Sequence, residues 1–294
     1  MIVISDVDKT LIDVGATEGS ACRRLFAALR EQGVPFGFAT SRPIESVERA
    51  LPFSTGLASF LVCSDGGVIV ERDPRGQWQV IHRQTLSSPL ELLPMILDCA
   101  PSTSSLFVFG DDRTQYSVAV RTTSDHERAA AEILGSRTRM ALEDVQDKEA
   151  GVLSIAILDD QANCRRACED IERSPAMTLE PLTIRVYDEV RVERNPMLWW
   201  CDVMSVTTDK GTACKWLLEQ EEFATARRDG GLIVLADGDN DAQLVEQADI
   251  AYCPPWASHL LQGKGKVVND VVDCEEFLTV IGPEILQRGG AAWG

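Results

Sequence analysis

Hydrophobic residues in the first eighty positions alternate between short continuous runs and helix-like spacing. Residues 1–5 and 35–41 are apolar runs typical of buried strands, whereas residues 20–34 and 42–51 carry apolar side chains at helical intervals. A strand followed by a glycine-rich turn and a hairpin is predicted across residues 60–84. Strand–helix–strand order of this kind predicts a parallel sheet with right-handed crossovers.

The middle of the chain has a different pattern, in which pairs of short strands alternate with helices. The predicted strands are residues 105–110 with 116–123, 153–158, and 182–187 with 189–194, and the predicted helices are 88–100, 125–135 and 161–172. Antiparallel pairs backed by helices indicate a compact α+β unit. Beyond residue 206 the parallel pattern returns, with a helix, an apolar strand at 231–239 and a further helix. The chain is therefore predicted to be an α/β protein, with a Rossmann-like core of residues 1–82 and 204–294 and an inserted α+β domain at 83–203.

The net charge and the cysteine content limit the classes of binding partner and the cellular compartment. The net charge of −18 argues against nucleic acids and anionic membranes, which are themselves polyanions. The nine cysteines are scattered and odd in number, and Cys164 and Cys168 lack a second pair or a nearby histidine for zinc. We interpret them as reduced thiols of a cytoplasmic protein. Asp6 interrupts the N-terminus before an export signal could form, and no run reaches the ~20 apolar residues of a membrane span.

Polar residues gather where the predicted parallel strands end. Four stretches carry them: DVDKT with Asp6 and Asp8, FATSRP with Thr40, TTDKGTA with Lys210, and LADGDNDAQL with Asp237, Asn240 and Asp241. Ligands of parallel sheets bind at the carboxyl ends of the strands, so these side chains are expected to form one site.

The chemistry of these stretches is complementary. Asp6 and Asp8 would repel each other at the end of a buried strand unless a cation compensated them. Carboxylates at Asp6 and Asp237 suit Mg²⁺, which prefers hard oxygen ligands and keeps waters or a phosphate in its shell. Lys210 adds a second positive charge and Thr40 a hydroxyl donor, as phosphate oxygens require. Lys210 is also predicted to lie at the start of a helix, where the helix dipole disfavours a positive charge. Its position therefore implies an anion nearby.

With these four motifs in this order, the chain resembles the phosphatases of the haloacid dehalogenase superfamily. The resemblance covers the whole predicted core and implies a covalent mechanism. It implies that Asp6 is the nucleophile, that Asp8 is the general acid and then the base, and that Thr40 and Lys210 hold the phosphoryl group. It also implies a Mg²⁺ site of Asp6, the Asp8 backbone carbonyl and Asp237, supported by Asn240 and Asp241.

The sequence departs from the family pattern at a few positions. Lys9 stands where these phosphatases usually have glycine. Ala236 replaces a common glycine before Asp237 and Ser41 replaces one after Thr40, and neither of these two changes removes a functional group. The DKT segment is similar to the phosphorylation motif of ion-pumping ATPases, but Leu11 and Ile12 replace the residues that motif requires. Asp8 argues against a dehalogenase, because this acid/base aspartate is typical of the phosphatases.

The spacing of the motifs places the inserted domain. Thr40 follows Thr10 closely, whereas a long segment separates Thr40 from Lys210, which resembles a type-two cap. The core motifs look most like those of the sugar-phosphate and mannosyl-3-phosphoglycerate phosphatase branch. The segment that leads from the inserted domain back to the core, however, lacks the Arg-Phe-x-His type of motif expected in that branch.

Five further residues are candidates for binding the substrate: Ser41, Arg42, Asp65, Arg194 and Asn195. Asp65 could equally be a turn residue and Arg42 could equally face solvent. One of Trp199 and Trp200 could stack on a substrate ring, while the other belongs in the interior.

Three functions remain open. A Mg²⁺-dependent phosphatase of a sugar phosphate or similar small metabolite explains most of the pattern. A phosphosugar mutase on the same core would need a second basic cluster for a bisphosphate, which the inserted domain does not display. A non-catalytic regulatory binder would normally have lost Asp6 or Asp8.

Overall fold

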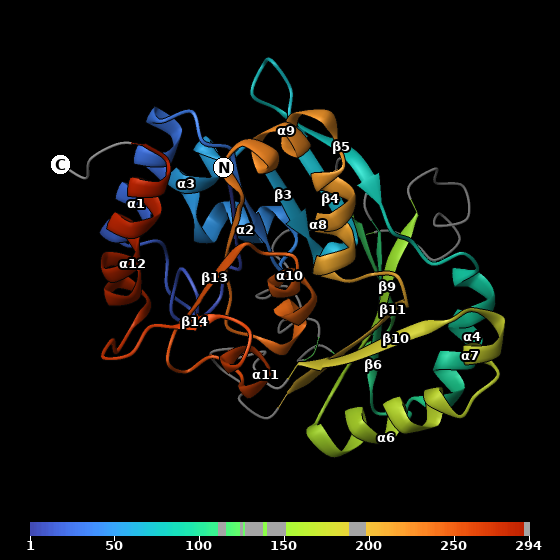
Figure 1. Cartoon of the computed structure of the whole chain (residues 1–294). Helices are drawn as coiled ribbons and strands as arrows, with labels where there is room; N and C mark the ends of the chain where they lie inside the picture. The colour runs from blue at the N-terminus through green and yellow to red at the C-terminus, as the bar shows by residue number, and fades with distance from the viewer. Residues whose placement is uncertain (111–115, 124–125, 127–137, 140–150, 188–197, 291–294) are drawn as a thin grey trace. The chain divides into compact units, whose positions relative to one another are not determined.

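The computed structural model describes residues 1–110, 116–123, 126, 138–139, 151–187 and 198–290. The chain divides into two compact units (Figure 1): a core unit of Met1–His82 with Asp209–Gly294, and an inserted unit of Arg83–Thr208. Both ends of the chain, blue and orange to red in Figure 1, therefore build the same unit.

The core unit is built on one mostly parallel sheet. Its strands are β1 (Ile2–Ser5), β2 (Phe36–Ala39), β3 (Phe60–Cys63), β4 (Val68–Arg72), β5 (Trp78–Arg83), β12 (Leu232–Leu235), β13 (Ile250–Cys253) and β14 (Lys266–Val267). They lie in the order β14-β13-β12-β1-β2-β3-β4-β5, and β14 to β3 run parallel. β4 returns antiparallel to β3. The strand order reverses beside β1, and ligands of open α/β sheets bind at such a switch point.

Helices cover both faces of this sheet. They are α1 (Ser20–Glu31), α2 (Ile44–Ala50), α3 (Pro52–Leu57), α8 (Lys210–Leu218), α9 (Glu221–Gly230), α10 (Ala242–Glu246), α11 (His259–Gln262) and α12 (Cys274–Arg288). In β1, Val3 joins the hydrophobic cluster of α1 and α12, whereas Ile2 and Ile4 join that of α8, α9 and α10. Because alternate residues of a strand face opposite sides, a strand buried on both faces must be continuously apolar.

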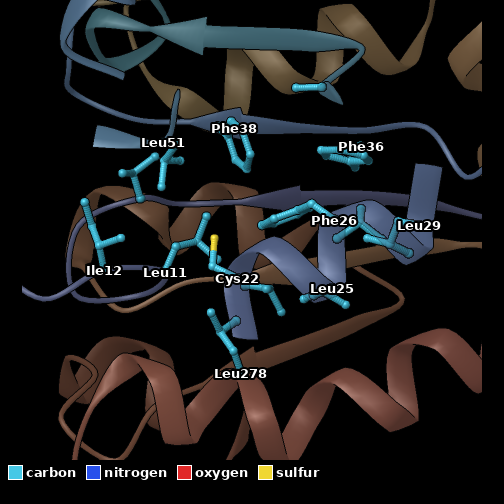
Figure 2. Close-up of a cluster of buried hydrophobic side chains, with 14 of the residues drawn as sticks. Leu11, Ile12, Cys22, Leu25, Phe26, Leu29, Phe36, Phe38, Leu51 and Leu278 are labelled. Atoms are coloured by element: carbon cyan, nitrogen blue, oxygen red, sulfur yellow. The ribbon is translucent and has the colours of Figure 1, made fainter. Parts of the chain in front are cut away.

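Aromatic packing fixes α1 against β2. The ring of Phe26 lies 4.8 Å from that of Phe36 and 5.0 Å from that of Phe38, measured between centroids (Figure 2). All three rings are fully buried. Edge-to-face and tilted pairs of this kind add to the free energy of burial, so they hold the segment that carries Thr40 in a fixed place.

In its described residues, the inserted unit is a sheet with helices on one face. Its strands are β6 (Ser105–Gly110), β7 (Tyr116–Arg121), β8 (Thr138–Arg139), β9 (Val152–Asp159), β10 (Leu182–Tyr187) and β11 (Trp199–Ser205), in the order β10-β11-β9-β6-β7-β8. Its helices are α4 (Pro89–Cys99), α6 (Gln161–Glu172) and α7 (Ala176–Leu179). All three contribute to one buried cluster with alternate residues of β6, β9 and β11. The opposite residues of the same strands lie outside that cluster.

The predicted fold class is confirmed, and the structure adds detail to the boundaries. The inserted unit was predicted to end at residue 203, whereas β11 pairs with β9 and β10 as far as Ser205 and the unit ends at Thr208. The strand predicted at 189–194 and the helix predicted at 125–135 lie almost wholly outside the described residues, and β10 pairs with β11. All nine cysteines are free. Within the described part of the chain, no helix combines the length and apolar character needed to cross a membrane.

Candidate active site

Asp6 stands directly after β1 and remains tied to the sheet. Its N–H donates to the carbonyl of Leu235 at 2.9 Å, one step beyond the β1–β12 ladder. The chain then turns tightly, because the N–H groups of Leu11 and Ile12 both return to the carbonyl of Val7. Lys9 takes a φ of 59° in this turn, in the left-handed region where glycine is least costly. Glycine would take this conformation at a lower cost than lysine.

Lys210 is a buried cation that lies between the carboxylates of Asp6 and Asp241. It opens α8, whose N-cap Asp209 accepts a hydrogen bond from the N–H of Thr212 at 2.8 Å. The Lys210 side chain is 2% exposed, and its Nζ donates to Asp6 Oδ1 at 2.5 Å and to Asp241 Oδ1 at 2.8 Å. Burial alone would lower the pKa of Lys210, but the charges of Asp241 and Asp6 outweigh it and raise that pKa. Lys210 therefore stays charged inside the site.

Asp241 organises the loop that follows β12. Its Oδ2 accepts the N–H groups of Asp237 at 3.3 Å and Gly238 at 3.1 Å, while its Oδ1 is held by Lys210. Thr10 crosses from the first loop and donates its hydroxyl to Asp237 Oδ1 at 3.0 Å. Asp241 therefore links this loop to Lys210 at the start of α8, and its supporting role at a metal site stays a prediction.

The carboxylates converge closely enough to bind a metal ion. Asp6, Asp237 and Asp241 offer oxygens that all lie within 4.8 Å of one another. Burial, followed by the charge of Asp241, raises the pKa of Asp237 to about 6. Burial is also the largest influence on Asp6, and it raises the pKa of that carboxyl despite the opposing charge of Lys210. An all-oxygen donor set whose negative charge is this costly without a counter-charge fits Mg²⁺.

Thr40 and Arg42 extend the site from β2. The N–H of Thr40 donates to the carbonyl of Val62, so the residue continues the β2–β3 ladder. Its hydroxyl accepts the N–H of Arg42 at 3.1 Å. The Arg42 guanidinium reaches Asp8, with Nε at 2.7 Å from Oδ2 and Nη2 at 2.6 Å from Oδ1. Burial lowers the pKa of Arg42, but the hydrogen bonds and charge of Asp8 raise it above its usual value. Ser41 beside them is exposed.

Asp65 lies in the turn after β3, in the left-handed conformation with a φ of 54°. It is almost fully buried, and its Oδ1 accepts a hydrogen bond from Asn240 Nδ2 at 3.0 Å. The next residue, Gly66, has a φ of +96°, and a Cβ there would lie 2.4 Å from the carbonyl oxygen of Asp209. This close approach needs glycine and brings the turn against the start of α8.

The structure thus brings the core residues of the prediction together. Asp6, Lys210, Asp237 and Asp241 share one network, Asp8 pairs with Arg42, and Asp65 pairs with Asn240. Arg194 and Asn195 lie outside the described residues.

Sequence reasoning missed two residues that shape the site. Trp256 donates its indole N–H to the carbonyl of Lys9 at 2.8 Å and so braces the first loop. Asp209 caps the N-terminus of α8. An aspartate directly before the first residue of a predicted helix is a typical N-cap, so the sequence carried a signal for this role.

The acidic site lies where the strand order of a parallel sheet reverses, and an α+β unit is inserted into the same chain. These features identify the protein as an α/β protein that carries its site at the carboxyl ends of the sheet strands. The family model of the haloacid dehalogenase-like hydrolases matches residues 3–271. The chain belongs to that family.

Solved structures share this fold at low sequence identity. A phosphatase of the haloalkanoate enzyme superfamily from Bacteroides thetaiotaomicron is 16% identical, with a TM-score of 0.69 and coverage of 98% of this chain and 95% of that one. A subclass IIB sugar phosphatase is 14% identical, with a TM-score of 0.66 and coverage of 97% and 99%. A protein from Thermotoga maritima is 15% identical, with a TM-score of 0.70 and coverage of 98% and 96%. No curated protein matches the chain at the threshold applied.

Proposed function

We propose that the protein is a Mg²⁺-dependent phosphatase that hydrolyses a sugar phosphate or a similar small phosphorylated metabolite through an aspartyl-phosphate. The observation that carries the proposal is the buried network in which Lys210 joins Asp6 to Asp241, beside Asp237. Holding two buried carboxylates and the half-buried Asp237 around one lysine is costly, and a bound divalent cation would offset that cost.

Each residue has a chemical task in this proposal. A carboxylate oxygen of Asp6 attacks phosphorus, and the bond from phosphorus to the leaving oxygen breaks while Asp8 supplies the proton that this oxygen takes. Water then attacks the aspartyl-phosphate, Asp8 accepts its proton, and inorganic phosphate leaves Asp6 as a carboxylate. Lys210 and the hydroxyl of Thr40 hold the transferring phosphoryl oxygens. Asp6, Asp237 and the Asp8 carbonyl would hold Mg²⁺, which neutralises phosphoryl charge when bound.

The similarity to a subclass IIB sugar phosphatase and the core motifs both favour a phosphorylated sugar or glycerate. The more specific branch, the mannosyl-3-phosphoglycerate phosphatases, remains part of the proposal, as does a cytoplasmic location. Substrate-binding roles for Ser41, Asp65, Arg194 and Asn195 stay predictions.

Release of inorganic phosphate tests the proposal. The wild type with Mg²⁺ should release phosphate from members of a panel of phosphorylated sugars and glycerates, and EDTA should stop the reaction. Calcium should inhibit, because its larger and looser coordination shell would misplace the nucleophile. Asp6→Asn should lower turnover at least about 10³-fold without unfolding the protein, whereas Glu222→Gln, which removes an exposed charge on α9, should leave it unchanged. Full activity in chelator, or in Asp6→Asn, would contradict the proposal.

A further inference from the structure

Arg42 makes a two-point contact with the side chain of Asp8. Both carboxylate oxygens are used, at 2.6 and 2.7 Å, in the parallel fork geometry that arginine forms with carboxylates. The two side chains are 24% and 33% exposed, so the pair is sheltered without being buried. Sequence reasoning assigned Arg42 to the substrate, but in the structure its guanidinium is engaged with Asp8.

Arg42 is itself held at three other points. Its Nη1 donates to Ser46 Oγ at 3.0 Å, its backbone N–H donates to Thr40 Oγ1 at 3.1 Å, and its carbonyl accepts the N–H of Ser64 at 3.0 Å. The guanidinium therefore sits on a braced support that includes the phosphoryl-binding candidate Thr40. Asp8, by contrast, lies on the short turn after β1 and gains a fixed orientation from this contact.

We propose that Arg42 is a positioning residue that orients Asp8 for its two proton transfers. This inference rests on the proposed phosphatase function. When Asp8 carries the proton for the leaving oxygen, its other oxygen can still accept from Arg42. When Asp8 later takes a proton from the attacking water, both oxygens are again available to the fork. Arg42 needs no contact with the phosphoryl group in either step.

The two roles open to Arg42 predict different dependence on the leaving group. An arginine that binds the phosphoryl group supports every ester equally. An arginine that acts through the general acid matters most for esters whose leaving oxygen is basic and needs a proton, and little for those that leave as stable anions. The value of kcat/KM isolates this first step, because it reports events up to formation of the aspartyl-phosphate.

The test uses phenyl phosphate, p-nitrophenyl phosphate and 2,4-dinitrophenyl phosphate, whose leaving groups grow steadily less basic. For Arg42→Gln, kcat/KM should fall about 10²-fold for phenyl phosphate, and less than about 5-fold for 2,4-dinitrophenyl phosphate. With that last ester the variant should show a rapid burst of dinitrophenol, because breakdown of the aspartyl-phosphate still needs Asp8. Arg42→Lys keeps the charge without the fork and should follow Arg42→Gln.

Two further variants complete the design. Ser46→Ala removes one support of the guanidinium and should show the same trend with smaller losses, and it covers the case in which Arg42 variants fold poorly. Arg49→Gln removes an exposed arginine on the same helix, α2, and should match the wild type.

The outcomes separate the two proposals. Equal losses on all three esters, no loss, or full activity in Arg42→Lys would overturn the positioning role while wild-type phosphate release upheld the phosphatase. A wild type that releases phosphate from no ester would overturn both.

Discussion

Buried carboxylates serve opposite purposes in the two units. In the core unit, Asp6 and Asp237 face other acids, and the pKa of each is raised, that of Asp237 to about 6. In the inserted unit, Asp159 is as little exposed as Asp6, yet its pKa is lowered. Burial would raise the pKa of Asp159, but hydrogen bonds led by the hydroxyl of Ser104, at 2.6 Å, outweigh that effect.

The difference distinguishes carboxylates that stabilise a fold from those placed for chemistry. Glu180 in the inserted unit accepts the N–H groups of Ser87, at 2.9 and 3.0 Å, and Ser88, at 3.3 Å, just before α4. Such acids satisfy backbone donors that would otherwise be buried unpaired. The core acids instead converge on one another around a single lysine, which leaves an excess of negative charge for a ligand to compensate.

Among the changes that compare the two units, removing Lys210 should have the largest combined effect on stability and turnover. Lys210→Met leaves Asp6 and Asp241 buried without their counter-charge, so we expect a loss of about 3 kcal/mol in the free energy of unfolding and at least about 10²-fold in turnover. Mg²⁺ should restore more stability to this variant than to the wild type, as measured by urea unfolding with and without the metal. Lys215→Met, an exposed position on the same helix, is the control. Unchanged stability would show that the core acids need no counter-charge.

Substitution of Arg194 or Asn195 tests whether the inserted unit sets specificity. If these residues read hydroxyl groups of the substrate, Arg194→Gln and Asn195→Ala should lower kcat/KM for the best sugar phosphate at least about tenfold. The same variants should change kcat/KM for p-nitrophenyl phosphate little. Arg166→Gln, which removes an exposed charge on α6, should affect neither. Equal losses on both esters would move specificity to other residues.

The pH dependence of metal binding should follow Asp237. Below about pH 6 its carboxyl holds a proton that a cation must displace, so the apparent Kd for Mg²⁺ should rise about tenfold per pH unit. In the absence of metal, the stability of the fold depends on pH in the opposite direction to metal affinity. The folded chain holds this proton more tightly than the unfolded chain, whose carboxyl has a pKa of 3.8, so the contribution of Asp237 to stability grows as pH falls from about 6.

Calorimetric titration with Mg²⁺ and thermal unfolding in EDTA, each at several pH values, measure these two dependences. Asp237→Asn should bind the metal weakly at every pH and lose this part of the stability profile. A wild-type affinity for Mg²⁺ that did not change with pH would contradict the assignment.

The smallest effect on activity is expected in the inserted unit. Glu180→Ala leaves the N–H groups of Ser87 and Ser88 without their acceptor, which should cost about 1–3 kcal/mol of unfolding free energy. Turnover of p-nitrophenyl phosphate at low temperature should stay within about 2-fold of the wild type. A large loss of turnover in a folded Glu180→Ala protein would show that this acid is not structural.

The sequence predicted much of the core site because strand order follows from local pattern. Apolar runs ending in Asp6 and Asp237 predict neighbouring parallel strands, and the carboxyl ends of such strands meet at one edge. The cation that compensates them was identifiable in Lys210, since a lysine at a helix N-terminus implies an anion nearby.

Other contacts could not be predicted from the sequence. The pair of Arg42 and Asp8 depends on the left-handed turn at Lys9, and a lysine gives no signal for that conformation. The bond between Asp65 and Asn240 joins turns 175 positions apart, and no periodicity links them. The inserted unit ends at Thr208 and not at the predicted residue 203, because β11 is a mixed polar and apolar strand whose pairing with β9 and β10 continues to Ser205.

The most direct test of the account is the identity of the phosphorylated residue. Asp8→Asn, which should slow breakdown of the intermediate, is mixed with 2,4-dinitrophenyl phosphate and Mg²⁺, quenched in acid and reduced with borohydride, which converts an aspartyl-phosphate to homoserine. Peptide mass spectrometry should find homoserine at position 6, and the double variant with Asp6→Asn should yield none. Modification at another residue, or phosphate release without any acyl-phosphate, would contradict the account.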